Sequence, residues 1–424
     1  MRILLSALVL CVSFVSASAQ AQVERRLADI CSILGGQPMQ FDTVFTSDFL
    51  RQVPQMQLTV LVQQLTKESG GCSSTRIVES QSPFSAKAEA LTVNGYTIPI
   101  SISVTAQPPH RIEGLFFKAP VKASASLTEV LADLKALAGS TSFFAKNLTT
   151  GAVLASSDTT SYLPIGSSFK LYVLGELVRS IARGEHRWDE VVVLDSSRYS
   201  FPSGILQTWP HGSPVTLHTL ASQMISISDN TATDILLNHL GERAVQNIQR
   251  QMGHSKPELN DPFLSTRQLF FLKFSDNGKR AIEYATLDAR GRAQLLRTIE
   301  TSVSKNDVDF VESTVLPDKV EWFARTPDLV RAMDWLHLQA KNQKVEPLLG
   351  VLGINPGLDI NRKVWSFVGY KGGSETGVLN MTFLLQHNNG HWYALSASWM
   401  RTDSDVELVS FSGLIERAIQ LLAP

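Results

Sequence analysis

The chain has 424 residues, of which 44% are hydrophobic, and its formal net charge is −1. This length is sufficient for two or more domains with separate cores. The balanced charge excludes the strongly basic surface typical of nucleic-acid binding, so we expect no nucleic-acid partner.

The N-terminal segment is typical of an export signal. Arg2 supplies positive charge, residues 3–15 form an apolar run, and Ala17-Ser18-Ala19 is a small-residue cleavage pattern. The run is too short to span a membrane, and no later run is long enough. We therefore predict a signal peptide over residues 1–19, cleavage after Ala19, and a periplasmic or secreted protein.

Three cysteines are present, and Cys11 would leave with the signal peptide. Cys31 and Cys72 remain, and in an oxidising compartment they either form one disulfide or lie as two separate buried thiols. The sequence has no Cys-x-x-Cys, and its His-x-x-x-His spacing, from His387 to His391, spans the predicted turn Asn388-Asn389-Gly390. We therefore predict neither a metal site nor a cofactor.

Residues 23–120 are predicted to form a first α+β unit, because helical periodicity comes first and a period of two follows. The helices are expected over residues 25–34, 45–50 and 56–66. The strands are expected over residues 75–79, 85–93, 98–106 and 111–117, with a hairpin turn at Asn94-Gly95.

This succession of elements resembles the small cone-shaped domains of the ketosteroid-isomerase and polyketide-cyclase type. The resemblance covers about 100 residues and rests on the pattern of elements, without a shared motif. Such domains often hold an apolar ligand in the cone. Because no acidic general base has a convincing context here, we expect a cone without a ligand.

Residues 125–424 are predicted to form a second domain with strands at both ends and helices between them. The helices are expected over residues 127–138, 167–184, 217–227, 231–240, 265–274, 288–301, 326–341 and 410–422. The strands are expected over residues 142–154 as a pair, and over 190–194, 364–370, 378–387 and 391–400. Both ends of this domain would therefore contribute to one sheet.

Ser167 and Lys170 lie three residues apart at the start of a predicted helix, on one face. A serine hydroxyl is a poor nucleophile near neutral pH and needs a base within hydrogen-bond reach. A lysine can be that base when burial or a neighbouring cation lowers its pKa. Taken alone, the pair is more typical of a helix cap and a solvated lysine.

Two further motifs follow in the chain. Ser228-Asp229-Asn230 lies in a loop before a predicted helix, and its alternative, purely structural interpretation is an N-cap. Lys371-Gly372-Gly373 follows a late strand, and its alternative interpretation is a strand-end lysine exposed to solvent. The order Ser-x-x-Lys, Ser-Asp-Asn, Lys-x-Gly is the motif order of class A β-lactamases and penicillin-binding proteins.

From about residue 127 to the end, the chain resembles this serine hydrolase family, most closely over PSGILQTWPHGSPVTLHTLASQMISISDNTATDIL. The two-domain layout is similar to proteins of the clavulanic acid pathway that join a ketosteroid-isomerase-like domain to such a domain. The resemblance implies an antiparallel sheet flanked by helices, together with an all-helical lobe.

The resemblance also implies catalytic roles for four residues. Ser167 would attack a carbonyl carbon, and Lys170 would accept its proton directly or through water. Ser228 would relay a proton to the leaving group. Lys371 would hold Ser228 and add positive potential.

Substrate contacts are implied in the same way. Asn230 would contact the substrate or Lys170, and Gly373 and Ser374 would bind the substrate. The backbone N–H groups of Ser167 and Ser374 would form the oxyanion hole.

Three features depart from the family pattern. Gly372 replaces the usual threonine or serine, so a hydroxyl that binds a substrate carboxylate is missing, and Ser374 is the candidate to replace it. The strand VLNMTFLL has no arginine where many relatives have one. In the segment HSKPELNDPFLSTRQLF, Glu258 is the candidate base for deacylation, against the alternative of a surface carboxylate.

Together these features predict an exported serine hydrolase that forms an acyl-enzyme on Ser167 and acts on a small molecule. A β-lactamase with slow deacylation is the leading prediction. The alternatives are an esterase on cephalosporin-like or other small esters, a D-Ala-D-Ala peptidase, and a non-hydrolytic β-lactam-binding protein. No oligomeric state is predicted.

Overall fold

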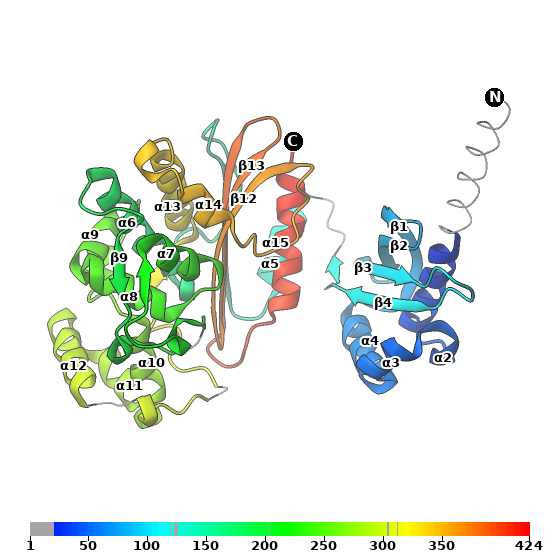
Figure 1. Cartoon of the computed structure of the whole chain (residues 1–424), viewed down its shortest axis with the longest axis horizontal. Helices are drawn as coiled ribbons and strands as arrows, with labels where there is room; N and C mark the ends of the chain where they lie inside the picture. The colour runs from blue at the N-terminus through cyan, green and yellow to red at the C-terminus, as the bar shows by residue number, and fades with distance from the viewer. Residues whose placement is uncertain (1–20, 119, 123–125, 202, 303–304, 312) are drawn as a thin grey trace. The chain divides into compact units, whose positions relative to one another are not determined.

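The computed structural model describes residues 21–118, 120–122, 126–201, 203–302, 305–311 and 313–424. The predicted signal peptide over residues 1–19 lies outside these ranges. The chain divides into two compact units, one up to Ala125 with Val409–Arg417 and the other of Ser126–Leu408 with Ala418–Pro424 (Figure 1).

The first unit consists of helices followed by an antiparallel sheet, as its sequence pattern predicts. Its helices cover residues 21–34 and form α2 (Phe41–Val44), α3 (Ser47–Gln52) and α4 (Gln55–Ser69). The strands are β1 (Cys72–Ser82), β2 (Ser85–Thr92), β3 (Tyr96–Val104), β4 (Ile112–Phe117) and β5 (Val121–Lys122). They are ordered β1-β2-β3-β4, and β5 pairs with β3.

One face of this sheet is buried because β2 and β3 alternate strictly between inward and outward side chains. The inward residues are alanines on β2, such as Ala88, and isoleucines on β3, such as Ile100. A disulfide joins Cys31, in the helix over residues 21–34, to Cys72 at the start of β1. The bond ties the first helix to the edge strand of the sheet.

The second unit contains a five-stranded antiparallel sheet to which both ends of the sequence segment contribute. The strands are β6 (Ser140–Asn147), β7 (Val153–Ser157), β12 (Trp365–Glu375), β13 (Val378–His387) and β14 (Trp392–Met400). Their order is β12-β13-β14-β6-β7, and Met400 on β14 pairs with Ser140 on β6. The sheet therefore joins strands from both ends of the segment, through residues 260 positions apart in the chain. Strand β12 lies at one edge of the sheet.

Helices fill the middle of this unit, and Figure 1 shows α6 to α12 gathered on one side of β12 and β13. The longer helices are α5 (Leu127–Ala136), α6 (Lys170–Arg183), α7 (Leu217–Ser226), α8 (Asn230–Leu240), α9 (Glu242–Gln251), α10 (Thr266–Phe274), α11 (Lys279–Thr286), α12 (Ala289–Ser302), α13 (Thr326–Gln339) and α14 (Leu348–Gly353). The last helix, α15 (Leu408–Leu422), is divided between the two units. Short elements are β8 (Leu163–Pro164) paired with β11 (Phe323–Ala324), β9 (Val191–Val193) paired with β10 (Pro214–Thr216), and the 3-10 turns η1 (Gly166–Phe169), η2 (Ser196–Arg198), η3 (Leu206–Thr208), η4 (Pro257–Asn260), η5 (Asp276–Gly278), η6 (Lys305–Asp307) and η7 (Gln343–Val345).

The structure confirms one local helix end, adds a helix and extends a strand. The helix predicted over residues 231–240 ends at Leu240 as expected, but α9, which begins directly after Gly241 at φ +89°, was not predicted. The prediction ends a strand at Tyr370, but β12 continues to Glu375 because Lys371 pairs with Thr382 and Gly373 pairs with Asn380. Strand pairing therefore extends β12 through glycines that usually end a strand.

Helix α6 is the centre of the helical lobe. Its residues from Lys170 to Val178 are all buried, so it has no solvent face over this length. A helix that is buried all round is held by packing on every side. The residues at its N-terminal end are therefore fixed in position, which is where the candidate site begins.

Candidate active site

Ser167 lies in η1, the turn that leads directly into α6, and this turn packs against the edge strand β12. A Cβ atom on Gly166, whose φ is +46°, would lie 2.9 Å from the backbone nitrogen of Ser374. A Cβ atom on Gly373 would collide with the backbone nitrogen of Ser167. Because only glycines allow this close approach, the two amide nitrogens expected to form an oxyanion hole lie on facing segments.

Ser168 fixes this turn to the sheet. Its hydroxyl donates to Oδ1 of Asn380 on β13 at 2.6 Å and to the carbonyl oxygen of Lys371 at 3.3 Å. Both bonds are buried. The nucleophile candidate is therefore held by its neighbour in sequence while its own side chain stays partly exposed.

Lys170 is fully buried, and its Nζ lies within hydrogen-bond distance of three neutral oxygen atoms. The acceptors are the carbonyl oxygen of Ser228 at 2.7 Å, Oγ of Ser228 at 3.0 Å and Oδ1 of Asn230 at 2.7 Å. Burial and then the positive charge of Lys371 lower the pKa of Lys170 well below its usual range, although Asp234 and Asp229 oppose the shift. The environment therefore favours a neutral amine that can accept a proton.

Ser228 has a strained backbone, with φ +57° in the left-handed region. Its carbonyl oxygen accepts from Nζ of Lys170 at 2.7 Å and from Oγ of Ser203 at 2.8 Å, which holds this conformation. Such a conformation costs about 1–3 kcal/mol for a residue other than glycine, and it is found most often at functional sites.

Asp229 has a different role from its two neighbours in the Ser-Asp-Asn motif. Its Oδ1 accepts from the amide of Ala232 and caps α8, which is the N-cap role predicted as the structural alternative. Its Oδ2 accepts from the amides of Ile205 and Leu206 at 2.6 and 2.8 Å. Asp229 therefore shapes the loop, while Ser228 and Asn230 contact Lys170.

Lys371 lies on β12 and is also buried, and its burial lowers its pKa to about 7. The role implied by the resemblance needs a correction here, because Nζ of Lys371 donates to the carbonyl oxygen of Gly372 and not to Ser228. In the structure Ser228 is held by Lys170. Lys371 acts on the site through its charge, which contributes to the lowered pKa of Lys170.

Tyr370 accounts for the glycine at position 372. A Cβ atom on Gly372 would collide with the Tyr370 hydroxyl, because residues two apart on a strand face the same side. Burial raises the pKa of Tyr370 to about 12, so its hydroxyl stays a hydrogen-bond donor at neutral pH. A phenol hydroxyl thus lies beside the position where a serine or threonine hydroxyl is missing, and the sequence reasoning overlooked it.

Glu258 lies in η4, and its side chain is 63% exposed. Its carboxylate lies 3.8 Å from Nη2 of Arg250. In the described part of the chain, the hydrogen bonds of Lys170, Ser228 and Asn230 do not include Glu258. The structure therefore brings the three sequence motifs together without this carboxylate.

A separate set of potential metal ligands consists of His186, Glu190 and His239, which do not belong to these motifs. In the ranges that the structure describes, no helix is long and apolar enough to cross a membrane.

Comparison with known proteins gives a family match over part of the chain and a fold for a larger part of it. Residues 122–309 match the model described as the beta-lactamase enzyme family. No curated protein matches the chain.

Two similar crystal structures are a representative of class A beta-lactamase from Bacteroides cellulosilyticus and a beta lactamase from Xanthomonas campestris. They are 15% and 14% identical to this chain, and each has a TM-score of 0.50. Each match covers 70% of this chain and 95% or 96% of the other. Residues 122–309 are therefore similar to the beta-lactamase enzyme family, and the chain contains a beta-lactamase-like fold.

Proposed function

We propose that the protein is a β-lactamase-type serine hydrolase that forms an acyl-enzyme on Ser167. The observation that supports this most strongly is the environment of Lys170, a buried amine one helical turn from Ser167 whose acceptors are all neutral. A buried lysine with a lowered pKa beside a candidate nucleophile is the arrangement that general-base catalysis needs.

In the proposed acylation, Oγ of Ser167 bonds to the carbonyl carbon of the β-lactam while its proton passes to Nζ of Lys170. The carbon–nitrogen bond of the ring then breaks, and the ring nitrogen takes a proton from the hydroxyl of Ser228. Lys170 returns its proton to Ser228, with which it shares a 3.0 Å hydrogen bond. The step therefore conserves protons and leaves Lys170 neutral.

The negative charge on the carbonyl oxygen would be stabilised by the amides of Ser167 and Ser374. Each such donor typically contributes about 2.7–4 kcal/mol to the transition state. Lys371 adds a positive charge nearby, and Asn230 keeps Lys170 in place through its 2.7 Å hydrogen bond. Gly373 and Ser374 would border the substrate along the exposed edge of β12.

Deacylation is proposed to be slow. It needs a base that activates water, and Glu258 is the candidate from the sequence, but its exposed ion pair with Arg250 is typical of a surface carboxylate. The same observation favours a second candidate function, a β-lactam-binding protein that is acylated once and releases the product slowly. An esterase or a D-Ala-D-Ala peptidase would use the same Ser167 and Lys170.

Intact-mass measurement after addition of a chromogenic cephalosporin distinguishes these functions. A persistent adduct that Ser167→Ala abolishes supports slow deacylation, and turnover without accumulation supports a fast β-lactamase. Cleavage of p-nitrophenyl esters without any cephalosporin adduct supports the esterase. Turnover that survives in Ser167→Ala contradicts the proposal altogether.

We also propose that residues 23–120 form a ketosteroid-isomerase-like domain, that residues 125–424 form the hydrolase domain, and that export removes residues 1–19. N-terminal sequencing of protein recovered from the periplasm or the medium tests the export. A first residue of Gln20 supports it, and a retained Met1 contradicts it.

A further inference from the structure

A second cluster of ionisable side chains lies at the opposite ends of the two helices that hold Lys170 and Asn230. His186 follows the end of α6 by three residues, and His239 lies in the last turn of α8. Glu190 directly precedes β9. The length of α6, about 20 Å at 1.5 Å per residue, separates this cluster from Ser167.

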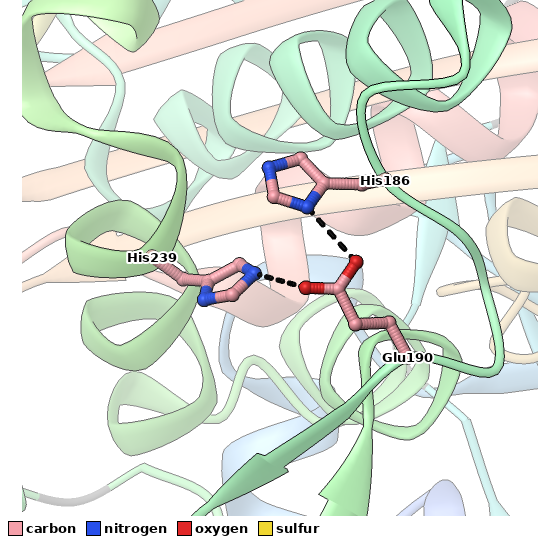
Figure 2. Close-up of side chains that lie close together, drawn as sticks. All are labelled: His186, Glu190 and His239. Atoms are coloured by element: carbon pink, nitrogen blue, oxygen red, sulfur yellow. Dashed lines mark hydrogen bonds and ion pairs between the residues drawn. The ribbon is translucent and has the colours of Figure 1, made fainter.

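The three side chains converge, and Figure 2 shows the carboxylate of Glu190 between the two imidazole rings. Nδ1 of His186 lies 2.9 Å from one oxygen of Glu190, and Nε2 of His239 lies 3.0 Å from the other. One ligand atom from each residue can be chosen so that all three lie within 4.8 Å of one another.

These distances are close to those of a zinc site. Ligands at about 2.0–2.1 Å from a tetrahedral zinc ion lie about 3.3 Å from one another. The contact between one Glu190 oxygen and its imidazole would lengthen by a few tenths of an ångström, and the other imidazole, which contacts the second oxygen, would move toward the ion. The side chains are 24%, 34% and 26% exposed, which leaves them room for this adjustment.

The surrounding charges favour a cation. The C-terminal ends of α6 and α8 carry partial negative charge because their last carbonyl groups lack helical partners. The nearby guanidinium groups are neutralised, since Arg187 pairs with Asp189 and Arg179 pairs with Glu176 and Glu185. Cation binding would therefore not meet an uncompensated arginine.

We propose that His186, Glu190 and His239 bind one zinc ion, with water as the fourth ligand. Two imidazoles and one carboxylate suit zinc better than magnesium or calcium, which prefer oxygen ligands. His186 also lines a surface depression of about 480 Å³, together with Trp188 and Lys344, which gives solvent and ions a path to the cluster.

Zinc at this position would connect the segment after α6 to the last turn of α8. It would stabilise the packing of the two helices whose other ends carry Lys170 and Asn230. The sequence motifs for metal sites did not predict it, because His239 is 49 residues from Glu190 in the chain.

The test is a zinc titration of the full chain, produced without a histidine tag, treated with EDTA and dialysed. We expect one zinc ion per chain by calorimetry, and a melting temperature about 5 °C higher at a zinc concentration of about 100 times Kd. Cobalt in place of zinc should give the visible absorption of a four-coordinate site. Absence of zinc binding up to about 100 µM would overturn the proposal.

Two variants and one control locate the site. Glu190→Gln and His239→Ala should weaken zinc binding at least about 100-fold, because each removes a ligand. His211→Ala removes an exposed histidine of the same unit and should bind zinc like the original protein. If Glu190→Gln binds zinc normally, the proposal is wrong. This variant can keep hydrogen bonds to both imidazoles, so we expect it to fold even where His239→Ala unfolds. Circular dichroism verifies its fold.

Discussion

Two lysines of the hydrolase unit have side chains fully removed from solvent, and their surroundings are opposite in kind. Lys170 faces only neutral acceptors from Ser228 and Asn230. Lys273, on α10, contacts the carboxylate of Glu375 and lies 3.5 Å from Oε1 of Glu321. One amine is surrounded by dipoles and the other by negative charges.

Burial disfavours the charged form of Glu321 beside Lys273. Burial and then the negative charge of Glu375 raise the pKa of Glu321 to about 8, although Lys273 opposes the shift. Oε1 of Glu321 has no hydrogen-bond partner among the described residues. This cluster joins α10 to the end of β12, immediately after Ser374.

The difference shows how the surroundings of a buried lysine indicate whether it stabilises the fold or accepts a proton. An amine paired with carboxylates holds elements together, and removing one partner leaves an uncompensated charge. An amine without a carboxylate has a lowered pKa and can accept a proton. The comparison predicts that substitutions of Lys170 and Lys273 have opposite consequences.

The largest expected effect is on chemistry. Lys170→Met removes the proposed base and should slow acylation of Ser167 by a chromogenic cephalosporin about 10²- to 10⁴-fold. Its free energy of unfolding should change by less than about 2 kcal/mol, because only neutral acceptors lose a donor. Stopped-flow acylation and urea denaturation measure the two quantities. Acylation within tenfold of the original rate would show that Lys170 is not the base.

Lys273→Met should have the larger effect on stability. It leaves the largely buried carboxylate of Glu375 without a cation, and the free energy of unfolding should fall by about 3–5 kcal/mol. Urea denaturation at pH 7 gives this value. The double variant with Glu375→Gln should recover part of the loss, and a single-variant loss below about 1 kcal/mol would remove the contrast with Lys170.

A third effect concerns pH. Acylation needs neutral Lys170 and protonated Lys371, and burial lowers the pKa of Lys371 to about 7. The rate should therefore decline as pH rises through about 7, and Lys371→Arg should move this decline upward by at least about one pH unit, because arginine stays protonated. A pH–rate profile of acylation measures the shift, and an unchanged decline would assign it to another group.

The same pKa has a consequence for stability. Because the folded pKa of Lys371 lies below the unfolded value of 10.5, its contribution is present above pH 10.5 and is lost as pH falls through about 7. Lys371 should therefore make the free energy of unfolding rise with pH between these limits.

The smallest effect is expected at an exposed ion pair. Glu258→Gln removes the contact with Arg250, and its deacylation rate should stay within about twofold of the original, with less than about 1 kcal/mol change in stability. Decay of the adduct followed by intact mass provides the rate. Deacylation that slows tenfold or more would identify Glu258 as the base after all.

The sequence predicted most elements of both units, because their signals are local. Alternation along β2 and β3, and the glycine after α6, depend on residues close together in the chain. The motif order also predicted which residues meet around Lys170. It did not predict α9, which begins after the expected helix end at Gly241, or the full length of β12, where strand pairing continued through two glycines.

By itself, then, the sequence determined the helix that presents Ser167 and Lys170 and the order of the three motifs. Only the tertiary structure decided that Lys170, and not Lys371, holds Ser228, that the Tyr370 hydroxyl lies against Gly372, and that His186, Glu190 and His239 meet. The physical reason is that burial, charge and close approach depend on residues from distant segments, and no local pattern specifies which of them become neighbours.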